Sequence, residues 1–213
     1  MKKIIAITAL LISSMGMQAQ LTAKDVFTKN EIVWYGLDFT KAHFVGQFDQ
    51  GFGIMPAKGW DMRNKWIPEW NALIGREQQN FDLRKTFRKD VVLFDLGPVN
   101  ELTKKMDGDL CMSFNPASIS AADIEQMVKL YEGTEKKEGI GLVFIVENFN
   151  KAEQIADIYV TFFDIATKKV LFSEKVQGKP MGNGMRNYWA GSIKNILKSI
   201  DGNFGSWKKK YGK

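Results

Sequence analysis

The feature that most constrains the fold is a long run of strand-forming sequence in the last third of the chain. Residues 140–149, IGLVFIVENF, are almost continuously apolar, which is typical of a strand covered on both faces. Residues 155–178 then alternate their side chains on both sides of a turn that reads DIATKK, and this pattern predicts an antiparallel hairpin. A chain with these segments must build its core around a sheet.

Helices are predicted between and after the strands. Ser120 and Asp123 form a capping-box pattern at the start of a helix whose apolar stripe continues to Tyr131. Further helices are expected at 66–88, 99–106 and 186–200, and further strands at 31–39 and 90–96. We therefore predict an α/β fold: a single-domain mixed β-sheet with packed helices and an antiparallel C-terminal hairpin followed by a C-terminal helix.

The strand expected at 31–39 carries one charged residue within an apolar run. A strict period of two puts this residue, Asp38, on the same face as Trp34. The opposite face then consists of Val33, Tyr35, Leu37 and Phe39.

The first 19 residues predict export. Lys2 and Lys3 precede an apolar run from Ile4 to Ile12, and small and polar residues follow up to Ala19, which is the layout of a signal peptide. We expect residues 20–213 to form the exported domain, periplasmic or secreted. No segment reaches the about 20 apolar residues of a transmembrane helix, and no cysteine near the cleavage point could carry a lipid.

Charge and cysteine content exclude some classes of function. The formal net charge of +6 falls to +4 without the two leader lysines, which is too low for a protein that binds nucleic acid tightly. Cys111 is the sole cysteine, so no internal disulfide can form. Complete dinucleotide-binding or Walker patterns are absent, and a lone histidine cannot build a metal site. We expect no cofactor and no metal.

The order of elements over residues 120–200, with the turn FFDIATKKVLFSE, resembles the amino-terminal domain of TolB and small envelope lipoproteins whose hairpins carry a similar turn. The phrases KEGIGLVFIVENFNKA and RNYWAGSIKNIL are similar to an uncharacterised family of exported proteins from Bacteroidetes-type bacteria. Proteins of the TolB-like group assemble with other envelope proteins and are not enzymes. The resemblance therefore implies an interaction role, although this chain lacks the lipidated cysteine of the lipoproteins.

A first candidate site follows the strand at 31–39. Asp38, Lys41 and His43 lie where open α/β sheets often place their binding sites. His43 could act as a general base only with an orienting carboxylate such as Asp38 and a nucleophile, for which Cys111 is the sole thiol. Neither lies in a recognisable nucleophile motif, so we predict no catalytic residue and assign the group to ligand or partner binding.

A second candidate site lies in GKPMGNGMRNYW, residues 178–189. The amides of Gly182 to Gly184 and a helix amino terminus, helped by Arg186, could bind a small anion. The alternative is a plain corner between a strand and a helix, for which glycines and Pro180 are well suited. We favour the corner, with Arg186 and Asn187 contributing to binding.

Three alternatives use other side chains. Carboxylates at strand ends could hydrolyse glycans as paired acids, although Asp164 is better explained as a turn former. Tryptophans separated by basic residues could bind sugar rings, although core packing is the simpler interpretation. The basic aromatic tail at 203–213 could contact anionic lipid or polysaccharide. The acids are Asp38, Asp95, Glu147 and Asp164, and the tryptophans are Trp60, Trp66 and Trp70.

These patterns together favour an exported, non-catalytic binding or assembly protein of the bacterial cell envelope. Its interaction surfaces would be a sheet edge, the glycine-rich loop at 46–59 and the region of Arg186. The expected partner is an envelope protein or a second copy of the chain, and then a small anion or a glycan. A carboxylate-based envelope hydrolase and a tryptophan-mediated glycan-binding module are the alternatives.

Overall fold

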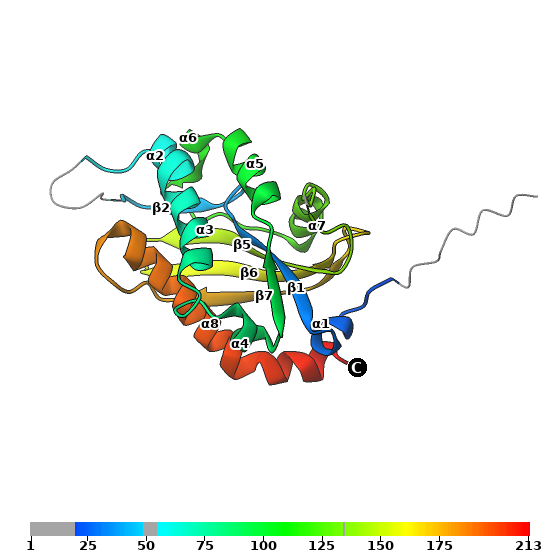
Figure 1. Ribbon diagram of the computed structural model, residues 1–213. Helices are drawn as coiled ribbons and strands as arrows, with labels where there is room; N and C mark the ends of the chain where they lie inside the picture. The colour runs from blue at the N-terminus through cyan, green and yellow to red at the C-terminus, as the bar shows by residue number, and fades with distance from the viewer. Residues whose placement is uncertain (1–19, 49–54, 134) are drawn as a thin grey trace, which may run out of the picture.

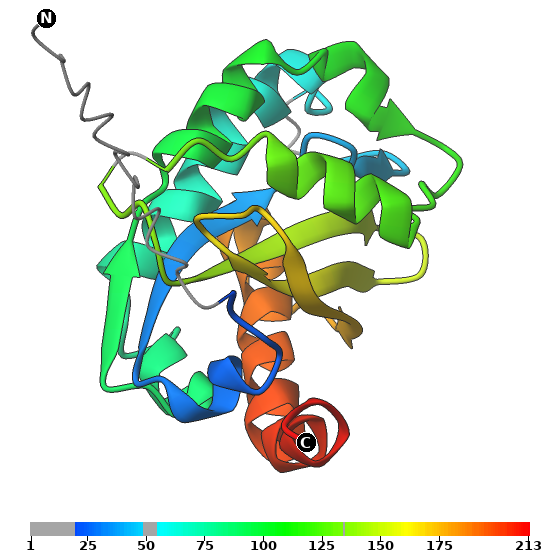
Figure 2. The same ribbon diagram turned by 90° about the vertical axis from the view of Figure 1, so that its right-hand side faces the viewer.

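The computed structural model describes residues 20–48, 55–133 and 135–213. They form a mixed sheet with helices on both faces, which confirms the predicted fold class (Figures 1 and 2). The predicted signal peptide and residues 49–54 of the glycine-rich loop lie outside the described residues. The elements in chain order are α1 Asp25–Thr28, β1 Glu31–Asp38, β2 His43–Val45, α2 Gly59–Asp61, η1 Met62–Trp66, α3 Ile67–Arg76, α4 Leu83–Phe87, β3 Val91–Phe94, α5 Gly97–Lys105, α6 Gly108–Cys111, β4 Met112–Ser113, α7 Ala121–Lys129, β5 Ile140–Asn150, β6 Ile155–Asp164, β7 Val170–Gly178 and α8 Gly184–Tyr211.

The sheet is organised around β5, all of whose residues are buried. On one side, β5 pairs in parallel first with β1 and then, near Asn150, with β2. On its other side lies β6, which is antiparallel to β5 and to β7. β3 is parallel to β1 and β4 is parallel to β2. Among the described strands, β3, β4 and β7 therefore have one open side each.

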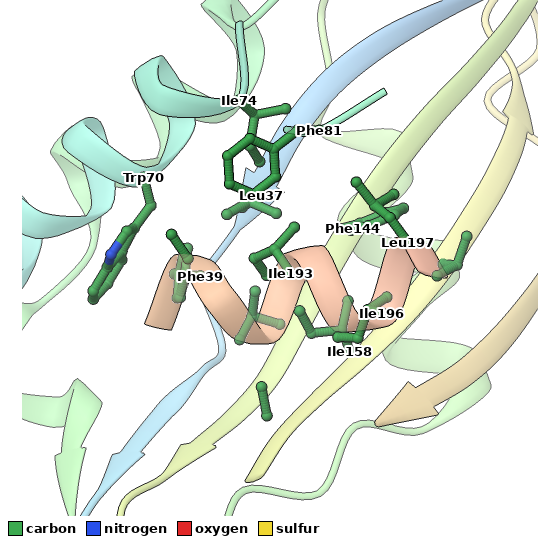
Figure 3. Packing of buried hydrophobic residues seen from close by; sticks show 14 of the residues in the cluster. Leu37, Phe39, Trp70, Ile74, Phe81, Phe144, Ile158, Ile193, Ile196 and Leu197 are labelled. Atoms are coloured by element: carbon green, nitrogen blue, oxygen red, sulfur yellow. The ribbon is translucent and has the colours of Figure 1, made fainter. Parts of the chain in front are cut away.

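The two faces of the sheet are covered by different helices. α8 and α3 cover one face, where Ile193 and Ile196 pack against strand residues such as Leu37 and Phe144 (Figure 3). α7 covers the opposite face, as the view in Figure 2 shows. Complete burial of an isoleucine side chain contributes about 2 kcal/mol to the free energy of unfolding. Since α8 buries several such side chains, it is a principal source of stability.

A bulge in β1 corrects the predicted faces of this strand. Gly36 has φ of +104°, and the pairing register with β5 shifts between Trp34 and Gly36. Asn71 of α3 fills the space beside this glycine, because its side-chain oxygen accepts from Leu37 N at 2.6 Å and a Cβ on Gly36 would collide with it. Trp34 consequently faces α8, whereas Asp38 faces α7; the prediction that they share a face was wrong.

The predicted extent of the helix at 66–88 was also wrong. The helical segment begins earlier, at Gly59, and α3 ends at Arg76. A turn follows, and α4 begins anew because the Asp82 side chain accepts a hydrogen bond from Lys85 N at 2.9 Å. The polar stretch that follows Arg76 in the sequence is therefore a connection rather than a continuation of the helix.

Other local predictions are confirmed. Ser120 and Asp123 form a reciprocal capping box at the start of α7. Asp164 accepts from Ala166 N at 2.9 Å in the turn between β6 and β7. α8 extends beyond the predicted residue 200 and takes in most of the basic tail, because Phe204 and Trp207 are buried against the core.

Candidate functional site

The carboxyl end of β1 carries a fully buried carboxylate. Asp38 accepts hydrogen bonds from Thr40 N at 2.7 Å, from Thr40 Oγ1 at 2.6 Å and from Tyr131 Oη at 2.5 Å. Burial raises the pKa of Asp38, and the hydrogen bonds from Thr40 and Tyr131 oppose that rise. Burial, followed by the nearby Asp38, also raises the pKa of Tyr131. Asp38 therefore joins α7 to the sheet and does not face solvent.

Lys41 lies on the loop that follows, and His43 is the first residue of β2. Lys41 pairs with the Asp123 carboxylate of the α7 capping box, and this contact lowers the pKa of Asp123. His43 Nδ1 lies 2.8 Å from the carbonyl oxygen of Asn115. Because a carbonyl only accepts, Nδ1 carries the proton, which leaves Nε2 of a neutral ring as an acceptor.

A hollow of about 130 Å³ lies beside these residues. Ligand pockets usually enclose about 300–1,000 Å³, so the hollow is too small for most substrates. Its lining includes Lys41, His43, Leu110 and Cys111.

Cys111 is not arranged as a nucleophile. The thiol is buried and donates to the carbonyl oxygen of Gly108 at 2.9 Å. Burial raises the pKa of Cys111 to about 12, so almost no thiolate forms near neutral pH. These observations disfavour a hydrolase built on Cys111 and His43.

Leu110, which lines the hollow, is one of four large apolar side chains that face solvent on α2, on α6 or on the segments beside them. Met55 is 70% exposed, Trp60 63%, Leu110 74% and Phe114 88%. Trp60 lies on α2 and Leu110 on α6, two helices at the upper end of the molecule in Figure 1, and Phe114 directly follows β4. We call these four residues the α2–α6 surface.

Two glycines hold the α2–α6 surface together. A Cβ added to Gly59 would lie 1.7 Å from the carbonyl oxygen of Gly108, so the backbones of α2 and α6 touch. On the side of Gly108, an added Cβ would lie 2.6 Å from the carbonyl oxygen of Gly59. Only glycine permits this approach, and the adjacent residues Trp60 and Leu110 are thereby brought to one end of the fold.

The partners of Glu147 and Asp38 disfavour a catalytic pair of acids. Glu147 lies at the irregularity where β5 shifts register against β6, and it is buried. Its carboxylate pairs with Lys175 and accepts from Ile119 N at 2.8 Å. The oxygens of Asp38 are likewise occupied by Thr40 and Tyr131. The hydrolase alternative required two acids converging in a pocket, and this geometry disfavours it.

The tryptophan platform is not formed. Trp66 and Trp70 stack with ring centroids 6.4 Å apart, but both are buried. Trp60 alone of the three is exposed. The glycan-binding alternative required at least two exposed, coplanar rings, so the tryptophans serve mainly as core.

Arg186 ties the corner before α8 to α3. Its guanidinium lies 3.2 Å from Glu77 Oε1 and 3.8 Å from Glu69 Oε2, and its carbonyl accepts from Trp70 Nε1 at 3.0 Å. These two carboxylates compete with any anion, which favours the structural interpretation of the corner. Asn187 is exposed.

The structure separates the five predicted site residues into two groups. Asp38, Lys41 and His43 are together at the carboxyl end of β1, on the side of α7. Arg186 and Asn187 lie at the start of α8, on the other face. The sequence analysis missed Leu110 and Phe114, because an apolar residue in a short segment carries no signal of its exposure.

Comparison with protein-family models, with curated proteins and with solved structures finds no significant match for this chain. Among the described residues, no three His, Cys, Asp or Glu side chains are grouped so that they could hold a metal ion. Within the same residues, no helix combines the length and the apolar character that crossing a bilayer requires. The functional argument therefore depends on the surface itself.

Proposed function

We propose that this protein is an exported, non-catalytic binding or assembly protein of the bacterial cell envelope, which docks another polypeptide on the α2–α6 surface. The observation that carries the proposal is the exposure of Trp60 and Leu110 on the touching helices α2 and α6, together with the exposure of Phe114 just after β4. Grouped apolar side chains of this size are typical of protein interaction sites, and tryptophan is enriched among the residues that dominate binding energy.

Polar groups at the edge of the α2–α6 surface support the same proposal. His43 Nε2 is left as an acceptor by the contact of Nδ1 with Asn115, and Lys41 lies close by on the rim of the hollow. An apolar centre with a polar rim is the usual anatomy of a protein interface. Lys41 and His43 thus keep their predicted role in partner binding, whereas Asp38 supports them from the interior.

Export remains part of the proposal on the evidence of the leader alone. Lys2 and Lys3 followed by an apolar run support it, as does the small residue Ala19. Fractionation of the producing cell, with mass determination of the mature chain, tests this part. A chain beginning at Gln20 outside the cytoplasm is expected, and an uncleaved cytoplasmic chain would refute export.

Site-specific photo-crosslinking tests the docking role. A photoreactive phenylalanine analogue placed at Trp60 or at Phe114 should give a discrete crosslinked species in the producing cell. The same analogue at Leu130, an apolar residue that is 59% exposed just after α7, is the matched control and should give none. Equal crosslinking at all three positions, or none at Trp60 and Phe114, would refute the proposal.

A further inference from the structure

The outer edge of β3 presents unpaired main-chain groups. Val91 N donates to the carbonyl of Asn30 at 3.1 Å and Asp95 N donates to the carbonyl of Trp34 at 2.9 Å, so odd-numbered residues face β1. Because successive residues of a strand alternate in direction, the N–H and C=O groups of Val92 and Phe94 point away from β1. No described strand pairs with β3 on that side.

A groove of about 470 Å³ runs beside this edge. Its apolar lining includes Phe81, Leu83, Val92 and Phe94, which belong to the core cluster or pack against it. Val91, at the start of the strand, is 41% exposed. The groove therefore places room for apolar side chains directly next to free main-chain donors and acceptors.

β3 also lacks the features that usually prevent an edge strand from pairing with another chain. Its sequence, VVLF, contains neither a charge nor a proline. β7, another strand with an open side, carries exposed Lys175, and Glu174 on it is bound by Lys210 of α8. β3 is thus the less protected of these two strands.

We propose that an extended segment of a partner polypeptide adds as a strand to the open edge of β3 and places alternate apolar side chains in the groove beside α4. The main-chain groups of Val92 and Phe94 select an extended backbone, which is the mode of recognition known as strand addition. The inference rests on the proposed binding role and names a second surface for it, which shares no residue with the α2–α6 surface.

Charges at the rim specify the occupant further. Arg84 of α4 is exposed, and it forms no ion pair with any residue that the structure describes. Asp90 lies on the same rim just before β3, while Asp82 is occupied as the cap of α4. An extended segment that carries one acidic and one basic residue around its apolar positions complements Arg84 and Asp90.

Selection from a phage-displayed library of random heptapeptides tests the inference on the mature protein. Selected peptides should alternate apolar residues, and the amide hydrogens of Val92 and Phe94 should exchange more slowly once the synthesised peptide is bound. Val92→Pro removes an outward N–H without removing a hydrogen bond to β1, and it should weaken peptide binding at least tenfold, whereas Val92→Thr, which keeps the N–H, should not. Arg84→Glu should weaken the binding of those peptides that carry an acidic residue.

A second measurement does not depend on the folding of a variant. N-methylation of the peptide amides that face β3 should abolish binding to the unchanged protein, and N-methylation of the alternate amides should not. Failure to select any peptide, protection of amides outside β3, or equal binding by Val92→Pro would overturn the inference. Dimerisation that Val92→Pro abolishes would assign the edge to a second copy of this chain and would also overturn it. None of these outcomes changes the crosslinking expected at Trp60 and Phe114, so the experiments test the two proposals independently.

Discussion

Tyr131 Oη donates a hydrogen bond of 2.5 Å to Asp38 Oδ2, and both residues are fully buried. This contact joins the residues after α7 to the carboxyl end of β1. It fixes the strand end from which the loop with Lys41 leads to His43 at the start of β2. The buried pair thus has a structural role between the residues after α7 and the end of β1.

Asp38→Asn should change how stability depends on pH. The folded pKa of Asp38 lies above its unfolded value, so the native state holds the proton more tightly and stability falls as pH rises from about 4 through the folded pKa. Asparagine lacks this titration, so the stability of the variant relative to the natural protein should increase over that window. Urea unfolding between pH 4 and 7 measures the difference, and parallel curves would contradict the assignment.

Tyr131→Phe is the complementary test of the same contact. It removes one hydrogen bond to a carboxylate and leaves a buried Asp38 oxygen unpaired, which should cost about 2 kcal/mol of unfolding free energy. The Asp38→Asn, Tyr131→Phe double variant should lose less than the sum of the two single changes. Strict additivity would show that the hydrogen bond does not couple the two residues.

The predictions that succeeded depended on signals confined to a few residues. Ser120 and Asp123 cap α7 through contacts three residues apart, and Asp164 forms its own turn, so neither depends on the rest of the fold. The prediction of which β1 side chains share a face was wrong because of the bulge at Gly36. Asn71 stabilises this bulge by accepting a hydrogen bond from the amide of Leu37, 34 residues away in the sequence. A pattern of period two contains no information on such a partner.

The candidate site was predictable only in part, for a related reason. His43 was proposed from its place after a strand, where the fold class favours binding sites, and Asp38 was proposed as the one charge within an apolar run; Lys41 was proposed with them. The placement of Leu110 beside Trp60 depends instead on the contact of Gly59 with Gly108, between segments distant in sequence. Single glycines and apolar residues give no indication of such a contact before the fold is known.

Gly59→Ala should destabilise the protein by about 3 kcal/mol, because its Cβ would meet the Gly108 carbonyl and force α2 from α6. Gly202→Ala is the matched control: it lies in α8 with no atom within 4 Å of the added carbon, and it should stabilise by about 1 kcal/mol. Thermal unfolding of both variants compares them. A neutral Gly59→Ala would show that α2 and α6 are not in close contact.

Lys175→Met should destabilise the protein by about 2 kcal/mol, since it leaves the buried Glu147 carboxylate with Ile119 N as its main partner. The half-exposed position of Lys175 keeps this loss below that of a fully buried pair. Adding Glu147→Gln should restore part of the loss. Chemical denaturation of the four proteins gives the coupling energy, and a value near zero would exclude a structural role for the pair.

Cys111 should resist thiol reagents in the folded protein at neutral pH and react only after unfolding, because burial raises its pKa to about 12. Labelling with a chromogenic disulfide, with and without denaturant, measures both states. Rapid labelling of the native protein would reopen the possibility of a cysteine nucleophile beside His43.

Native mass spectrometry of the mature protein, drawn gently from the envelope of its producing cell, most directly tests whether the α2–α6 surface docks another polypeptide. The natural protein should carry the added mass of a second polypeptide, and the Trp60→Ser, Phe114→Ser variant should appear without it. Both side chains are largely exposed, so the variant should fold normally, as thermal unfolding would verify. A bare monomer from the natural protein, or the same complex from both proteins, would contradict the proposed function.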